Sequence, residues 1–136
     1  MFQKKAKKTQ SRIDCLIGAG TTIEGNINFS GGLRIDGCVK GNVTVADGSM
    51  ATLVLSELGR IEGEIRVSNV VINGAVLGSI HASEYVELQV KANVTGNVCY
   101  KSMEIQQGAV VQGKLVHSDE TSDKIVSFKS ASGLES

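Results

Sequence analysis

The side chains of this 136-residue chain that could act as bases, nucleophiles or metal ligands are two histidines and three cysteines. His81 and His117 are far apart, and neither stands beside an acid in a recognisable acid–base motif. Cys15, Cys38 and Cys99 are odd in number and widely spaced, which argues against a disulfide framework and against a zinc site. We interpret the cysteines as small buried hydrophobic residues. The sequence therefore predicts no catalytic residue, no cofactor-binding residue and no metal ligand.

The elements that must position these side chains repeat along the chain. A motif of the form apolar-x-Gly-x-apolar occurs six times, and its central glycines are Gly25, Gly41, Gly63, Gly78, Gly96 and Gly113. The glycines are separated by 16, 22, 15, 18 and 17 residues. An apolar-x-apolar pair such as Leu53 and Leu55 precedes the motif, and in two units the gap between them is shorter by two residues. Turn-prone or polar residues lie in between. This pattern predicts short strands of period two and no helix.

The strand period places the motif in space. Residues i, i+2 and i+4 of a strand share a face, so Ile23, Gly25 and Ile27 should point inward while Glu24 and Asn26 point outward. An inward glycine between two inward hydrophobic residues marks a narrow corner that has no room for a side chain. Repetition every 18 residues or so stacks these corners, which predicts a parallel β-helix of about six coils with a triangular cross-section. An antiparallel barrel would need hairpin turns and a shorter repeat.

Composition and charge divide the chain into three parts. Residues 1–12 carry five basic residues and no acid, residues 13–117 contain the repeats, and residues 118–136 are rich in serine. We expect a flexible basic tail, a single β-helix domain and a flexible C-terminal tail, in which the apolar group Ile125, Val126 and Phe128 either docks or stays disordered. No apolar run is long enough for a spanning helix, and the N-terminus is unlike a signal peptide, so the expected compartment is the cytoplasm.

The two ends of the predicted β-helix carry no obvious cap. An uncapped end leaves a row of unpaired backbone groups and an apolar layer, which is a template for another copy of the same chain. About five backbone hydrogen bonds per junction, at about 0.5–1.5 kcal/mol each, would favour end-to-end polymerisation without nucleotide. The candidate polymerisation residues of the terminal coils are Ile17, Ile23, Ile27, Met103, Ile105, Val111 and Leu115.

Residues 13–117 resemble the bactofilins, a family of bacterial cytoskeletal proteins. The resemblance rests on the repeated cores and on segments such as LRIDGCVKGNV and VVINGAVLGSI, and the opening Met-Phe with its lysine cluster is similar to the membrane-targeting tail of many members. It implies a right-handed β-helix that polymerises end to end without nucleotide into filaments on the inner face of the cytoplasmic membrane. There the filaments would localise cell-wall enzymes, including peptidoglycan hydrolases, and influence cell shape. The residues expected to target the membrane are Met1, Phe2, Lys4, Lys5, Lys7 and Lys8.

Two other functions stay open at this stage. Left-handed β-helix acyltransferases of the hexapeptide family also have coils of about 18 residues and often use a histidine base, which would make His81 the candidate. A non-polymerising adaptor could instead bind partners along the faces of the helix. A nucleic-acid partner is not expected, because residues 13–117 are mildly acidic and offer no basic face that continues the N-terminal lysines.

Overall fold

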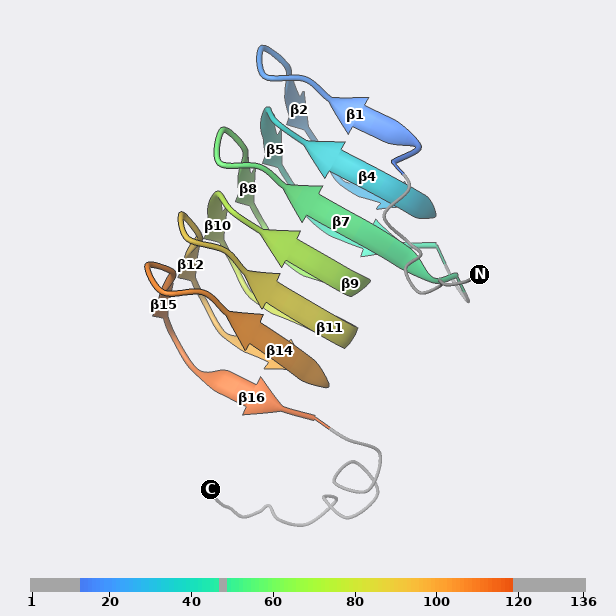
Figure 1. The fold of residues 1–136 in the computed structure, drawn as a ribbon. Helices are drawn as coiled ribbons and strands as arrows, with labels where there is room; N and C mark the ends of the chain where they lie inside the picture. The colour runs from blue at the N-terminus through green and yellow to red at the C-terminus, as the bar shows by residue number, and fades with distance from the viewer. Residues whose placement is uncertain (1–12, 47–48, 119–136) are drawn as a thin grey trace, which may run out of the picture.

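Each coil of the chain contributes three short β-strand segments, which pair in parallel with the equivalent segments of the adjacent coils (Figure 1). The computed structural model describes residues 13–46 and 49–118. These residues form sixteen strands and no helix. The six-stranded sheet takes one strand from each coil, so the described chain makes six coils. The all-β parallel β-helix expected from the repeat is confirmed.

The strands lie on three faces, which follow one another around each coil. The first face contains β1 (Cys15–Ile17), β4 (Gly31–Ile35), β7 (Ala51–Leu55), the second halves of β9 (Ile65–Ile72) and β11 (Ile80–Leu88), and β14 (Ser102–Ile105). The second face contains β2 (Thr22–Glu24), β5 (Cys38–Lys40), β8 (Arg60–Glu62), β10 (Ala75–Leu77), β12 (Asn93–Thr95) and β15 (Val110–Gln112). The third face contains β3 (Ile27–Phe29), β6 (Val43–Val45), the first halves of β9 and β11, β13 (Val98–Tyr100) and β16 (Leu115–His117).

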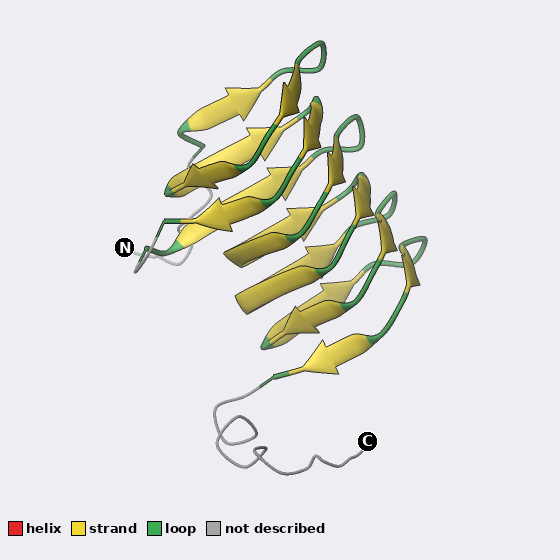
Figure 2. Ribbon diagram, turned by 180° about the vertical axis from the view of Figure 1, so that it is seen from behind, coloured by secondary structure: helices red, strands yellow, loops and turns green. Residues whose placement is uncertain are grey.

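The coils wind in a right-handed sense. In Figure 1 each coil crosses the front of the molecule from right to left on the first face and returns from left to right behind it, while successive coils descend from the N-terminal end to the C-terminal end. Figure 2 shows the same stack from behind, with the strands of the third face running across it. The observed hand agrees with the one that the family resemblance implies.

Ladders of identical or similar apolar side chains fill the interior. On the second face Val39, Ile61 and Val76 are in register, and all three are fully buried. The first face contributes two inward residues per coil, for example Leu53 and Leu55, which pair with Val70 and Ile72 of the next coil. The outward residues between them are polar or only partly buried. The alternation predicted from the sequence is therefore confirmed, and branched aliphatic side chains form the core.

The repeated glycines form a column at the corner between the second and third faces. The sequence predicted that a narrow interior at this corner excludes side chains, but the structure shows a different reason for glycine. A β-carbon built on Gly78 would not point into the interior. It would clash with the carbonyl oxygen of Gly63 in the preceding coil and lie 2.6 Å from its carbonyl carbon. The same holds for Gly96 over Gly78. Only glycine lets adjacent coils approach this closely, so the column sets the distance between backbones rather than the width of the core.

The other two corners differ in length from coil to coil. At the first corner, between the first and second faces, four-residue turns occur in coils 1, 3, 5 and 6, whereas coils 2 and 4 have two-residue turns at 36–37 and 73–74. These are the two units that the sequence shows to be shorter by two. At the third corner, between the third face and the next coil, β9 continues without a turn. There the buried Ser68 hydroxyl accepts a hydrogen bond from the Ala51 N–H at 2.7 Å and donates one to the Ala51 carbonyl oxygen at 3.0 Å.

Candidate self-assembly surfaces

Backbone hydrogen bonds join each coil to the next and stop at the terminal coils. The Gly96 N–H donates to the carbonyl oxygen of Gln112 at 3.0 Å, and the Val98 N–H donates to that of Lys114 at 2.8 Å. Gly113 and Leu115 occupy the same positions in coil 6, beyond which the described residues contain no further coil. At the other end, the equivalent carbonyl groups of coil 1 have no preceding coil within the described residues. Among the described residues, each end of the stack therefore has a sheet edge that no strand pairs with and that another strand could extend.

The apolar residues predicted for polymerisation lie at these two ends, in two separate groups. At the C-terminal end Ile105 is 45% exposed and Leu115 is 44% exposed, although the residues that precede them in the same ladders, Leu88 and Val98, are fully buried. Met103 and Val111 are half-buried against the core. The C-terminal coil thus keeps an apolar layer open on the side where the next coil would lie.

The N-terminal group is less open. Ile17 is buried, with 7% of its surface exposed, while Ile23 and Ile27 are half-buried and pack against the core. The structure therefore places all seven predicted residues in the terminal coils, but it leaves the C-terminal members more accessible. The predicted membrane-targeting residues, at positions 1–8, lie outside the described residues.

An apolar rim around the terminal coils was missed by the sequence analysis. Leu16 is 57% exposed, Val110 is 44% exposed and Val116 is 42% exposed, and all three point outward rather than into the core. The residues in register with them in the adjacent inner coils are respectively Arg34, Asn93 and Cys99. An alignment of the repeats could have found this rim, because two of these outward positions change from a polar residue to an aliphatic one at the terminal coil.

The residues that could have supported catalysis do not come together. His81 points outward from the third face, while His117 lies in the last coil with its ring 5.5 Å from that of Tyr100 and its Nε2 atom 3.1 Å from the Lys101 carbonyl oxygen. No group of three or more histidine, cysteine or acidic residues in the described part of the chain could hold a metal ion. The right-handed winding also differs from the left-handed coil of hexapeptide acyltransferases, so the fold gives that alternative no support.

The interpretation of the cysteines as buried residues was wrong. Cys15 is exposed, and Cys38 and Cys99 are only half-buried. Cys38 precedes the inward Val39, and Cys99 follows the inward Val98, so the strand alternation directs both thiols outward. Partial burial raises the pKa of the Cys99 thiol, and this effect is opposed by the positive charge of Arg66. The raised pKa disfavours the thiolate of Cys99, which is the nucleophilic form of a cysteine.

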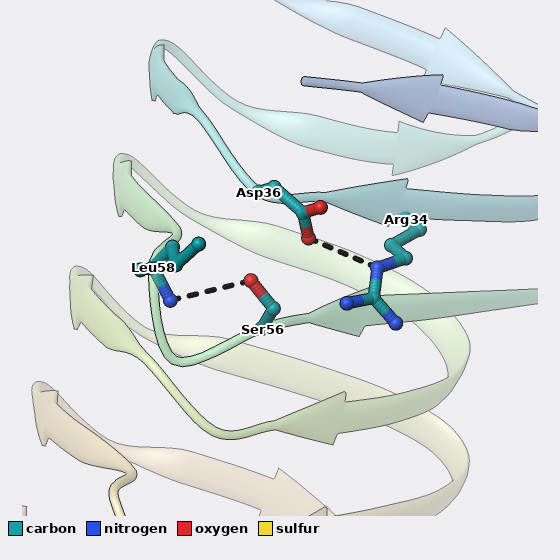
Figure 3. A network of polar contacts seen from close by, with 4 residues as sticks. All are labelled: Arg34, Asp36, Ser56 and Leu58. Atoms are coloured by element: carbon teal, nitrogen blue, oxygen red, sulfur yellow. Dashed lines mark hydrogen bonds and ion pairs between the residues drawn. The ribbon is translucent and has the colours of Figure 1, made fainter. Parts of the chain in front are cut away.

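Polar side chains on the outer surface connect neighbouring coils. In Figure 3 the Nε atom of Arg34 donates to Asp36 at 2.9 Å, and the Leu58 N–H donates to the Ser56 hydroxyl at 3.2 Å in the turn of the next coil. Hydrogen bonds from Ser56 and then Arg34 lower the pKa of Asp36. This network holds the short turn of coil 2 against the longer turn of coil 3. It has a structural role and leaves the two ends as the candidate functional surfaces.

These features define a class of protein: a parallel β-solenoid with an apolar core, whose terminal coils have strand edges that no described residue pairs with. The comparison with known families agrees with this class. Residues 15–116 match the bactofilin family, described as polymer-forming cytoskeletal. The chain therefore belongs to the bactofilin family.

Two relatives come from Myxococcus xanthus (strain DK1622). The chain is 31% identical to bactofilin BacO over 109 residues, a match that covers 80% of this chain and 83% of BacO. It is 27% identical to bactofilin BacP over 120 residues, which cover 88% of this chain but only 48%, about half, of BacP. No solved structure gives a significant match. Among the described residues there is no helix with the length and apolar character needed to cross a membrane.

Proposed function

We propose that this chain polymerises end to end, through its terminal coils and without nucleotide, into filaments that attach to the inner face of the cytoplasmic membrane and localise cell-wall enzymes. Membership of the family supports the general statement that the chain is a polymer-forming cytoskeletal protein. The observation that supports the terminal coils as the contact is the partial exposure of Ile105 and Leu115, which occupy ladder positions that are fully buried in the inner coils. A second copy stacked on coil 6 would bury them and pair the open sheet edge.

Sedimentation and negative-stain electron microscopy of the purified chain test this proposal. Without nucleotide, the protein should form sedimenting filaments as thin as one β-solenoid. Addition of a nucleotide triphosphate and magnesium should change neither the yield nor the rate of assembly, because no phosphate-binding motif is present in the sequence. Uniform small particles at high protein concentration would contradict the proposal.

Membrane attachment is assigned to residues 1–12, which we propose to act as a tail separate from the solenoid of residues 13–117. Phe2 can insert at the bilayer interface, and each nearby lysine contributes about 1 kcal/mol toward binding an anionic surface. Replacement of Lys4, Lys5, Lys7 and Lys8 by glutamine should therefore weaken binding to anionic vesicles by about two to three orders of magnitude. Uncharged vesicles are the control. Equal binding of the wild type to both kinds of vesicle would contradict an electrostatic tether.

The proposed role in the cell is that of a scaffold, which a long polymer on the membrane could provide. Such a polymer offers many identical binding surfaces in one place, which suits a scaffold for peptidoglycan hydrolases or other cell-wall enzymes and thus an influence on cell shape. Deletion of the gene should disperse at least one cell-wall enzyme that is otherwise localised, and a polymerisation-deficient variant should fail to restore its position. An unchanged cell shape together with an unchanged distribution of these enzymes would contradict this role.

A further inference from the structure

A groove of about 380 Å³ runs along the third corner, on the side of the solenoid rather than at its ends. Val45 and Ser49 of coils 2 and 3 line one part of it, and Ser118, the last described residue, lines another. Outward side chains of the third face lie between these two parts. The groove therefore spans several coils, and stacking of further copies on the two ends would leave it accessible.

The side chains along the groove follow an ordered sequence. Cys99, His81 and Arg66 are in register on successive coils, and all three line the groove. Adjacent strands are about 4.8 Å apart, so a chain that starts at Ser118 in coil 6 meets His81 after about 10 Å, Arg66 after about 14 Å and Val45 after about 19 Å. The groove thus has one cationic side chain, Arg66, about 14 Å from Ser118, and the apolar Val45 lies at its far end. Ala82 and Val67 line it in the coils between.

The charge of the groove favours an acidic occupant. None of the described residues that line it is acidic, while Arg66 contributes a cation whose side chain is 57% exposed. One nitrogen of the guanidinium lies 3.2 Å from the Glu64 carboxylate, and an arginine has further donors to offer. A second carboxylate could therefore bind Arg66 from the open side of the groove.

In the C-terminal segment that follows Ser118, acidic residues precede apolar ones, so the segment can bring an acid to Arg66 and then an apolar residue to Val45. It begins at the edge of the groove, and its sequence carries the acids Asp119, Glu120 and Asp123 before the apolar group Ile125, Val126 and Phe128. An extended chain advances about 3.3 Å per residue, so Asp123 would arrive after about 16 Å, beside Arg66, and Ile125 after about 23 Å, just past Val45. Phe128 would arrive only after about 33 Å, beyond coil 1, which is about 24 Å from coil 6. We propose that residues 119–125 of this chain dock into the third-corner groove of the same molecule, with Asp123 on Arg66 and Ile125 at the end of the groove, next to Val45.

A single tryptophan reports whether this contact forms. The chain has no tryptophan, so the full-length variant Ile125→Trp carries one reporter at the apolar residue next to Val45, and Leu134→Trp carries one near the C-terminal end of the chain as a matched control. We expect Ile125→Trp to emit at shorter wavelength and to be quenched several-fold less by acrylamide than Leu134→Trp. Both measurements apply equally to filaments and to dispersed protein, so they do not depend on the proposed polymerisation.

A charge exchange tests the assigned pair without altering the reporter. In the Ile125→Trp background, Asp123→Lys should release the segment and restore the emission and quenching of the Leu134→Trp control. Arg66→Glu should also release it, and the combination of Arg66→Glu with Asp123→Lys should recover at least half of the protection. Recovery by the double variant also shows that Arg66→Glu leaves the solenoid folded.

Three results would overturn the proposal. If Ile125→Trp is as exposed as Leu134→Trp, the segment does not occupy the groove, which is then left for another protein. If the charge exchange gives no recovery, the assigned pair is wrong. If dilution of the reporter chain into an excess of wild-type chain changes the emission, the segment docks on a neighbouring copy rather than on its own.

Discussion

Replacement of Leu115 by lysine should block assembly without unfolding the solenoid. Leu115 is 44% exposed at the open face of coil 6. Complete burial of a leucine side chain is worth about 1.5–3 kcal/mol, so burial of the remaining 44% by a second copy is worth about 1 kcal/mol per junction. A lysine at this position loses that gain and adds the cost of desolvating its ammonium group, about 1–3 kcal/mol if the side chain partly escapes to solvent. The total is about 2–4 kcal/mol.

This energy translates into a measurable change in the critical concentration. At 1.4 kcal/mol per factor of ten, Leu115→Lys should raise the critical concentration for sedimentation by about 30- to 1000-fold. The matched control is Leu77→Lys, because Leu77 has a similar exposure of 39% but points outward from the side of the solenoid. Both variants should unfold within a few degrees of each other. Assembly of Leu115→Lys at the wild-type concentration, or an equal defect in Leu77→Lys, would refute the assignment of coil 6 as a polymerisation surface.

Three further predictions concern the solenoid itself. Gly78→Ala should lower the free energy of unfolding by about 2 kcal/mol or more, because the added β-carbon would clash with the preceding coil and the φ of Gly78 is +152°. Gly20→Ala is the control. Gly20 has open space around it, so this variant should have little effect on thermal unfolding. Ser68→Ala should cost about 1–3 kcal/mol in chemical denaturation, because the buried hydroxyl bonds to the backbone of the neighbouring coil; a loss below 0.5 kcal/mol would show that water replaces it. The alkylation rate of Cys99 should rise with pH through a midpoint above that of a cysteine in an unfolded peptide, because burial disfavours its thiolate. A midpoint below that of the peptide would contradict the described environment.

Much of the fold could be predicted because the repeat encodes it directly. Alternation of residues around Gly41 assigns Val39 and Val43 to the interior, and both are fully buried. The same alternation assigns Cys38 to the exterior. The cysteines were wrongly predicted to be buried because the prediction used the general preference of cysteine for the interior, although the strand alternation already indicated the opposite. Handedness could not be derived, because a left-handed and a right-handed coil have the same spacing of inward residues. Only the family resemblance supplied it.

The surfaces were harder to predict than the core. The open ends could be expected because no repeat precedes Ile17 or follows Leu115. Their unequal exposure depends on how each terminal side chain packs, which the repeat does not specify. The third-corner groove depends on the extra residues between β6 and β7 and on the continuous path of β9, where Ser68 replaces a turn. These segments depart from the repeat, so the repeat pattern could not predict their conformation or the groove that they form.

The central claim is that the solenoids stack end to end through their terminal coils. The direction of the strand spacing in aligned filaments tests this claim most directly. If the coils stack end to end, the solenoid axis lies along the filament, and the strands cross it at about a right angle. Fibre diffraction or cryo-electron microscopy should then show the strand spacing of about 4.8 Å along the filament axis, in a filament no wider than one solenoid. A 4.8 Å spacing perpendicular to the axis would mean that the solenoids associate side by side, and the terminal coils would not be the polymerisation surfaces.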